Sequence, residues 1–462
     1  MTRQTTYSAP SRLYPPTVTP PDQPLPLAKY CLTFIKNPLQ AIPRQVYEQP
    51  IVTYRPAPNT TIVWVTDPPL IESILRDKDG RFEKSPLEKR AFQRTVRQSL
   101  LTAEGTDWRW QRHAIAPLFR LTEIAGYVPA MLAAAQDLIK DWHSHPPEAL
   151  RRIDKDMTDV TFSVIARTML KGGEPSQSLA IKQAGEAYLS SIPWEMIWAL
   201  LQMPQWLPHL ATWKLNRKSQ AMRRAVATVV AQHPSSDPSK DDLMARLKAA
   251  RHPDTGETMD TNLLVDNLLT LLIAGHETTA KALAWTLYLL ARAPDWQEAV
   301  RHEINCVTHG SQISEEHLGQ LHITSRVIKE SMRLYPPAPV LARQPLETIE
   351  LAGNRIPSKA QVVIPIFCVH RHRRLWDDPD LFNPDRFLPA QSGHISRTQY
   401  MPFGAGLRTC VGMSFAMVEA TALLAAFIQN AEFSWDGQHT PEPISRITLR
   451  SKGGMPLFVR TI

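Results

Sequence analysis

The chain has 462 residues, of which 43% are hydrophobic and 21% are charged, which is the composition of an ordinary globular protein. Lysine and arginine (52) outnumber aspartate and glutamate (44), but they are dispersed and form no basic-aromatic stripe of the kind that binds nucleic acid. No apolar run near the N-terminus reaches the roughly 20 residues of a membrane span, and no signal-peptide pattern is present. We therefore expect a cytoplasmic protein with no transmembrane anchor and no nucleic-acid partner.

The start of the chain is rich in proline. Several of the 40 prolines fall in the stretch PSRLYPPTVTPPDQPLP, so residues 1–30 are expected to form an extended and mostly unpacked segment. No Gly/Ser linker, charge block or change of composition divides the chain after residue 30. Residues 31–462 are therefore expected to form a single domain.

Apolar residues at helical spacing dominate this domain. Strand-like alternation is confined to short pieces at residues 51–55, 61–65, 349–353 and 361–367. The sequence therefore predicts the mainly α class with small β-sheets. It shows no repeat and no glycine-rich nucleotide-binding motif.

A short helix is predicted around residues 105–113, with the sequence GTDWRWQRH. Trp108 and Arg112 stand four residues apart and therefore share one helix face. An indole N–H and a guanidinium on one face could both donate to an anionic ligand. An amphipathic surface helix would have the same pattern, and that alternative stays open.

The longest periodic stretch runs from about Leu263 to Arg292, with Asp260, Thr261 and Asn262 as capping candidates and Pro294 as a stop. At 1.5 Å per residue this helix is about 45 Å long, enough to cross the domain.

The middle of the long helix has the sequence AGHETT, which contains residues of low helix propensity. Glycine costs about 1 kcal/mol relative to alanine in a helix, and threonines compete for backbone carbonyls. Gly275 opens a groove, and the Thr278 hydroxyl can bond the Ala274 carbonyl, which makes room for a small ligand and water. Glu277 is an acid placed to move protons. A packing notch between helices is the alternative.

A third motif lies in VIKESMRLYPP. Glu330 and Arg333 stand three apart and share a helix face, and Pro336 and Pro337 end that helix. The apolar neighbours leave little room for a solvated face. A buried ion pair that needs further partners is therefore expected.

The four cysteines lie far apart without a CxxC pair, so neither a disulfide framework nor a zinc site is predicted. Cys410 stands out because two glycines precede it in FGAGLRTCVG and an apolar helix follows. Glycines let backbone N–H groups turn toward the sulfur, and a helix N-terminus adds positive potential. Both lower the pKa of a thiol. Such a thiolate could attack as a nucleophile in a hydrolase, bind a soft metal or ligate haem. A buried cysteine in a glycine turn is the simpler alternative.

Taken together, these motifs resemble those of the cytochrome P450 family. FGAGLRTCVG is similar to the family's haem-binding loop FxxGxRxCxG, and AGHETT is similar to its oxygen-binding motif, 132 residues upstream (410 minus 278). ExxR and WxxxR occur in the family's order. The resemblance implies the cytochrome P450 fold, a triangular helical prism with haem b between the long central helix and the helix after the cysteine. Residues 31–462 would then be the haem-binding catalytic domain.

The resemblance also implies roles for single residues. Cys410 would ligate the haem iron, and the oxygen-activating site would consist of Thr278, Glu277 and Gly275. The remaining cofactor-binding residues would be Phe403, Ala274, Trp108, Arg112, Arg343 and Arg408, with the last four near the haem propionates. Glu330, Arg333 and Arg386, the last in a PxRF-like segment, would form a structural network. His370 and His372 are interpreted as loop histidines.

The implied function is a haem-thiolate monooxygenase that inserts one atom of O₂ into a lipophilic small molecule by hydroxylation or epoxidation. The chain ends 52 residues after Cys410 (462 minus 410) without a flavin-binding pattern. Electrons are therefore expected from a separate ferredoxin or flavodoxin with an NAD(P)H reductase. Candidates for a positive docking face are Arg109, His113, Arg120 and Arg397. A haem-thiolate sensor or electron-transfer protein is the alternative, and it would not need the Thr278 site.

Substrate contacts are placed by family analogy only. They would come from residues 82–100, from the apolar stretch at residues 191–208, and from the positions Leu272, Ile273, Pro339, Val340 and Leu341.

Overall fold

The computed structural model describes residues 12–57, 60–146, 149–169, 212–232 and 243–462. Most of these residues lie in helices, as expected. The helices before residue 250 are α1 (Leu27–Lys36), α2 (Pro68–Arg76), α3 (Pro86–Val96), α4 (Gly105–Ile115), α5 (Leu121–Ala125), α6 (Val128–His143), α7 (Ile153–Met169), α9 (Thr212–Gln232) and α10 (Leu243–Ala249). Those after it are α11 (Thr261–Arg292), α12 (Pro294–Thr308), α13 (Glu315–Leu318), α14 (His322–Leu334), α15 (Ile366–Val369), α16 (Pro389–Ser392) and α17 (Met413–Asn430).

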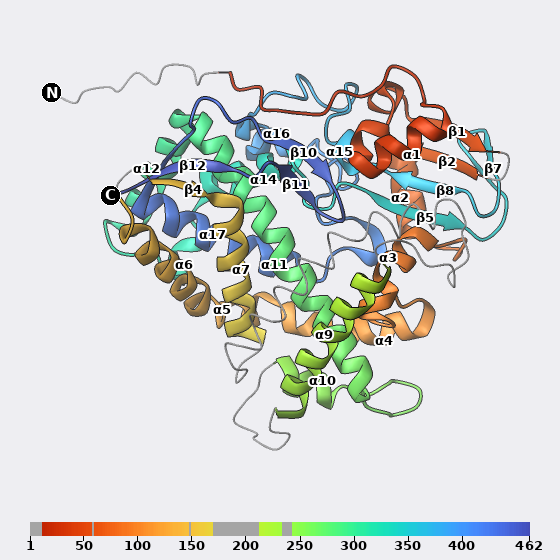
Figure 1. Cartoon of the computed structure of the whole chain (residues 1–462), viewed down its shortest axis with the longest axis horizontal. Helices are drawn as coiled ribbons and strands as arrows, with labels where there is room; N and C mark the ends of the chain where they lie inside the picture. Colours follow the sequence, from red (N-terminus) through yellow and green to blue (C-terminus); the bar gives the residue numbers. More distant parts are fainter. Residues whose placement is uncertain (1–11, 58–59, 147–148, 170–211, 233–242) are drawn as a thin grey trace.

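The strands form small sheets at the edges of the helical body (Figure 1). One sheet has the order β1-β2-β8-β5-β3, with β1 (Ile51–Ala57), β2 (Thr60–Val65), β3 (Phe82–Lys84), β5 (Leu341–Pro345) and β8 (Gln361–Ile364). Its pairs are antiparallel except for β2 with β8. A second sheet has the order β4-β12-β9, with β4 (Ala149–Arg152), β9 (Ala431–Ser434) and β12 (Pro456–Thr461). The pairs β6 (Ile349–Leu351) with β7 (Asn354–Ile356) and β10 (Glu442–Ser445) with β11 (Leu449–Lys452) are hairpins.

The long helix α11 runs through the middle of the molecule (Figure 1). It begins where the Asp260 side chain accepts a hydrogen bond from the Leu263 backbone N–H at 2.7 Å, as the capping pattern predicted. Its 32 residues pack against α7, α9, α14 and α17, and most of its side chains are buried. At 1.5 Å per residue α11 is about 48 Å long. It therefore places the AGHETT motif in the interior.

The described part of the proline-rich segment, residues 12–30, packs some of its apolar side chains on the domain, contrary to the expectation that it is mostly unpacked. Among its described residues, Leu13, Val18 and Leu25 are buried. The Pro16 carbonyl accepts a hydrogen bond from the Tyr335 hydroxyl at 2.6 Å. A proline-rich segment forms few hydrogen bonds within itself, so its backbone carbonyls can accept hydrogen bonds from the rest of the domain. The apolar side chains between the prolines are buried at the same time.

Among the described helices, α17 is long and apolar enough to cross a membrane by length and composition, and a bent pair, Gly105–Phe119 with Leu121–His143, would pass the same test. However, 61% of the apolar window of α17 is buried inside the protein. It packs against α6, α11, α12 and α14. The apolar character of α17 is thus accounted for by its place in the core.

Candidate active site

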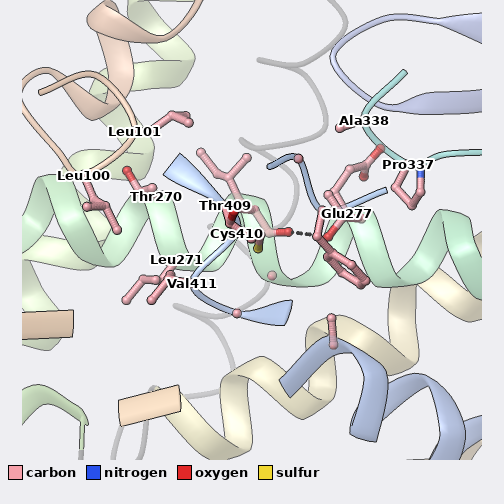
Figure 2. A pocket seen from close by; sticks show the side chains of 18 of the residues that line it. Leu100, Leu101, Thr270, Leu271, Glu277, Pro337, Ala338, Thr409, Cys410 and Val411 are labelled. Carbon is pink, nitrogen blue, oxygen red and sulfur yellow. Dashed lines mark hydrogen bonds between the residues drawn. The ribbon is translucent and has the colours of Figure 1, made fainter. Parts of the chain in front are cut away.

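A cavity of about 370 Å³ lies between α11, the loop before α17 and the sheet that contains β5. Figure 2 shows Leu100, Thr270 and Leu271 toward one end of it, Cys410 near the middle, and Glu277 with Pro337 and Ala338 toward the other end. Most of the wall is apolar. The apolar side chains on it include Phe92, Val96, Leu100, Leu101, Phe119, Ile165, Leu271, Ile273, Leu341, Phe415 and Ile447.

The loop that carries Cys410 is shaped by its glycines. Gly406 has a φ of +71°, and a side chain there would approach the Leu75 carbonyl oxygen of α2 to 2.2 Å. Only glycine satisfies both conditions. The Cys410 backbone N–H then donates to the Phe403 carbonyl at 2.9 Å, which closes the loop. The cysteine and Phe403 both lie on the cavity wall.

The Cys410 sulfur is open to the cavity but surrounded by protein on its other sides. Burial raises the pKa of this thiol, while the Gly412 backbone N–H and the charge of Arg112 act in the opposite direction. The low pKa expected from the sequence is therefore not reached by the polypeptide alone, because burial outweighs the N–H donors. A cation bound at the sulfur would remove the proton outright.

The central helix brings Thr278 and Ala274 onto the cavity wall. The Thr278 hydroxyl donates to the Ala274 carbonyl at 2.8 Å, which is the hydrogen bond that the sequence predicted. The lone pairs of the Thr278 oxygen are still available to a small ligand or water, because this hydroxyl donates its own proton to the carbonyl. A hydroxyl is thus held on the cavity wall that also carries the sulfur.

Gly275 lines the cavity, and so does Ile165 of α7, which lies next to it. A side chain at Gly275 would meet the Ile165 Cδ1 atom at 2.8 Å. This glycine therefore also serves the contact between α7 and α11.

Glu277 was expected to supply protons, but its carboxylate is held by cations. The Arg450 Nη2 atom lies 2.9 Å from it, the Lys281 Nζ atom 3.7 Å, and the Thr448 hydroxyl donates to it at 3.0 Å. Burial raises the pKa of Glu277, but the two cations lower it by more, and the net pKa lies below its ordinary value. At neutral pH this group carries no proton to donate, since its surroundings stabilise the ionised form.

Cations gather at another part of the cavity wall. We call Lys84, Arg112, Arg343 and Arg408 the cation cluster. Lys84 and Arg343 face each other across the β3–β5 pair. The Arg408 guanidinium lies over the Trp108 ring at 4.5 Å and that of Arg112 at 5.8 Å.

The cation cluster fits the two carboxylates of haem b. Arg408 contacts Glu104 and donates to the Ala103 carbonyl at 3.0 Å, and Glu88 lies nearby. Burial, with the neighbouring arginines, lowers the pKa of Lys84 to about 8. Like charges brought together in this way indicate an anionic ligand. Four of the expected propionate residues, including Trp108, lie here. Lys84 was missed, because one lysine in a short strand gives no signal.

The Glu330–Arg333 pair is buried as predicted, with both side chains fully inaccessible. The two side chains share hydrogen bonds of 2.7 Å, and Arg333 also donates to the carbonyls of His370, Pro379 and Leu381. Arg386 lies 3.6 Å from Glu330 as the third member of the network.

His370 lies in the turn after α15, as expected of a loop histidine, and it is fully buried there. Its Nε2 atom accepts from the Met401 backbone N–H at 2.9 Å, and its Nδ1 atom lies 3.2 Å from the Arg333 carbonyl. Burial lowers the pKa of His370 to about 3, so the ring is neutral and can accept at Nε2. It connects α14 to the segment that leads into the cysteine loop.

The expected substrate contacts are partly corrected. Ile273 and Leu341 line the cavity, whereas Leu272, Pro339 and Val340 are not among the described residues that do. On α11 the wall is formed by Thr270 and Leu271 instead of Leu272, because Leu272 faces the core. Pro337 and Ala338 replace Pro339, whose carbonyl bonds the Phe367 backbone N–H. The stretch at residues 191–208 lies outside the described residues.

The family model described as cytochrome P450 matches residues 19–458. This chain belongs to the cytochrome P450 family. Its relatives include cyclooctatin synthase of Streptomyces melanosporofaciens, 31% identical over 87% of each chain, and cytokinin hydroxylase of Arabidopsis thaliana, 30% identical over 86% of this chain and 79% of the relative. The crystal structure of the cytochrome P450DA heme domain has the same fold, with a TM-score of 0.79 over 96% of this chain and 97% of the other at 23% identity.

Membership of the P450 family makes the chain an oxidoreductase that binds haem b and uses O₂. The cation cluster and the thiol of Cys410 are the groups on the cavity wall that suit the two ends of such a cofactor, its propionates and its iron.

Proposed function

We propose that this P450 is a monooxygenase that oxidises a lipophilic small molecule, with Cys410 as the ligand of the haem iron. Thr278 would serve oxygen activation, and a separate ferredoxin or flavodoxin with its NAD(P)H reductase would supply electrons. The observation that carries the proposal is the position of the Cys410 sulfur on the wall of an apolar cavity that the Thr278 hydroxyl also lines. Haem b, when bound, supplies the iron at which O₂ is reduced. Thr278 holds a hydroxyl there that can pass a proton.

The overall reaction consumes one O₂, two electrons and two protons for each C–H bond oxidised. One oxygen atom enters the substrate as a hydroxyl group, and the other leaves as water. An alkene would take the oxygen atom as an epoxide with the same balance. Both products are among the expected outcomes.

The apolar wall supports a substrate of hydrocarbon character. Two relatives from Streptomyces are named pentalenene oxygenase and cyclooctat-9-en-7-ol 5-monooxygenase, names that denote an alkene and an unsaturated alcohol. Thr270, a buried residue on the wall, offers a lone pair to one such hydroxyl because its own proton is donated to the Asp266 carbonyl at 2.9 Å.

The test is isotope incorporation from ¹⁸O₂ with the haem-loaded protein, a reductase system and a set of lipophilic compounds. Wild type should transfer one labelled atom to product. Thr278→Ala should lower the product formed per electron on the order of 100-fold, and Thr278→Ser should restore most of it, because serine keeps the hydroxyl.

The competing function is a haem-thiolate protein that senses a ligand or only transfers electrons. Electron uptake and ligand binding without labelled product, for every compound that shifts the Soret band, would favour that alternative and overturn the monooxygenase proposal.

A further inference from the structure

Asp266 is a buried charge on α11 that the cavity chemistry does not use. It is 3% exposed and lies one helical turn before Thr270. Its Oδ1 atom pairs with the Arg223 Nη1 atom of α9, and its Oδ2 atom accepts from the Gln98 backbone N–H at 3.2 Å. Arg223 Nη1 also donates to the Thr95 carbonyl at 2.8 Å. One ion pair thus joins α9, α11 and the segment at residues 95–101.

Asn267, the next residue of α11, holds the same segment. Its Oδ1 atom accepts from the Leu100 backbone N–H at 2.9 Å, and its Nδ2 atom donates to the Leu263 carbonyl at 3.1 Å. From the other side, the Gln111 side chain of α4 donates to the Gln98 carbonyl at 2.9 Å. We call Asp266, Asn267 and Arg223 the clasp.

The segment held by the clasp is a wall of the cavity. Val96, Leu100 and Leu101 line it, and Figure 2 shows Leu100 and Leu101 near Thr270 and Leu271, toward the end away from Glu277. Side chains here would contact the part of a substrate that extends along α11 away from Thr278. A shift of the segment would change which part of a substrate lies near the Thr278 hydroxyl.

Two features indicate that the clasp holds the backbone of residues 95–101 in one position against α11, beyond providing hydrogen-bond partners for buried polar groups. Arg97 has a φ of +35°, a left-handed conformation that a non-glycine residue keeps only where its neighbours hold it. A buried carboxylate–guanidinium pair also costs desolvation, and apolar residues of similar size often replace such a pair without loss of stability. Burial raises the pKa of Asp266 even with Arg223 beside it, which shows that this cost is present.

We propose that the clasp positions residues 95–101 against α11 and thereby determines which bond of the substrate is oxidised. This inference rests on the proposed monooxygenase function. Asp266, Asn267 and Arg223 are positioning residues, since they act on the substrate through the wall and not by contact with the reacting atoms.

The test compares haem-loaded wild type with Asp266→Asn, which keeps an acceptor for Gln98 but loses the charge that holds Arg223. Amide hydrogen exchange at Gln98 and Leu100 should accelerate at least about tenfold. The product distribution should broaden, and the order of dissociation constants for a ligand series, read from the Soret shift, should change. Haem content and the electron input per O₂ should stay as in wild type.

Asp156→Asn is the matched control. Asp156 is a comparably buried carboxylate that pairs with Arg151 at 3.2 Å and bonds the Trp142 indole at 3.0 Å, and it is not among the residues that line the cavity. This variant should lower the melting temperature without altering exchange in residues 95–101, ligand order or product distribution.

Asp266→Leu/Arg223→Met replaces the pair by apolar residues and keeps the test valid if Asp266→Asn folds poorly. A wild-type product distribution and ligand order in both variants would overturn the clasp proposal while leaving the monooxygenase proposal intact. If wild type gave no product from any compound, the monooxygenase proposal would fail. The ligand order, which needs no turnover, would still decide whether the clasp positions the wall.

Discussion

At the scale of single residues, the clearest sign of a cofactor is the repulsion within the cation cluster. Burial is the main cause that lowers the pKa of Lys84 and of Arg408, and the charges of neighbouring arginines lower both further. Glu88 and Glu104 act in the opposite direction. A pair of carboxylates bound at the cluster would relieve the repulsion, so cofactor binding should stabilise the folded protein.

Glu419 of α17 is a buried acid whose protonation should affect stability. It is fully inaccessible, and neither carboxyl oxygen has a hydrogen-bond partner among the described residues. The Thr279 hydroxyl lies close enough to favour the charged form, but it donates to the Gly275 carbonyl at 3.3 Å. Burial raises the pKa of Glu419 to about 8.

Because this folded-state pKa lies above the unfolded value of about 4.3, the folded protein binds more protons between pH 4.3 and pH 8. The contribution of Glu419 to the free energy of unfolding is fully present below that window and is lost as the pH rises through it. Glu419→Gln should therefore be more stable than wild type at pH 8 by about 4–5 kcal/mol, and the difference should shrink toward pH 5. Denaturant unfolding at several pH values measures this. Glu432→Gln, at a half-buried glutamate that pairs with Arg460, should show the same pH dependence as wild type, and an unchanged pH dependence in Glu419→Gln would contradict the assignment.

The motif residues could be predicted from the sequence because each motif is short and local. The Thr278–Ala274 hydrogen bond follows from i, i+4 geometry alone. Lys84 and His370 could not be predicted, because their partners come from distant elements. The ion pair of Glu277 could not be predicted for the same reason, because its cation Arg450 lies 173 residues away in the chain.

At the scale of elements, the contact between α7 and α11 depends on Gly275. A methyl group there gains helix propensity of about 1 kcal/mol but meets the Ile165 Cδ1 atom, and overpacking of a core costs about 1–3 kcal/mol. Gly275→Ala should lower the free energy of unfolding by about 1 kcal/mol.

Ile165→Val removes the clashing atom, so the double variant Gly275→Ala/Ile165→Val should be more stable than the sum of the single effects predicts. A double-mutant cycle by thermal unfolding measures this coupling. If the effects of the two single substitutions on the free energy of unfolding were strictly additive, Gly275 would not be required for packing against Ile165.

The presence of helices was easier to predict from the sequence than the secondary structure of short apolar runs. The expected helix at residues 263–292 is α11 with two more residues at its start, since capping and periodicity agree. The run at residues 361–367 was expected to alternate as one strand, but β8 stops at Ile364, and α15 begins after Pro365. Proline cannot continue the ladder, and burial alone does not distinguish a strand from a helix in so short a run.

At the scale of the whole molecule, the basic residues that were expected to receive a redox partner are all exposed. Arg109, His113, Arg120 and Arg397 are exposed, and so are the apolar side chains Leu121, Leu407 and Met413. Leu407 and Met413 flank Cys410 in the chain, and α5, where Leu121 lies, packs against α17. Exposed apolar groups with basic neighbours are typical of a docking site for an acidic protein.

Charge reversal at Arg109 and Arg120 should slow electron transfer from an acidic ferredoxin or flavodoxin about tenfold at low salt, and less at high salt, where screening is strong. Stopped-flow reduction at two ionic strengths measures this. Arg355→Glu, on the exposed β6–β7 hairpin, is the control and should leave the rate unchanged. Equal rates in all variants would remove these basic residues as the docking site.

The ligation of iron by Cys410 is the claim on which the whole account depends. The most direct measurement is the carbon monoxide difference spectrum of the reduced, haem-loaded protein, compared among wild type, Cys410→Ser and Cys368→Ser. Cys368 is the control because it is fully buried and lies off the cavity wall. We expect the long-wavelength Soret band of a thiolate-ligated haem in wild type and Cys368→Ser, and its loss in Cys410→Ser. An unshifted Soret band in wild type, or a shifted band that survives in Cys410→Ser, would contradict it.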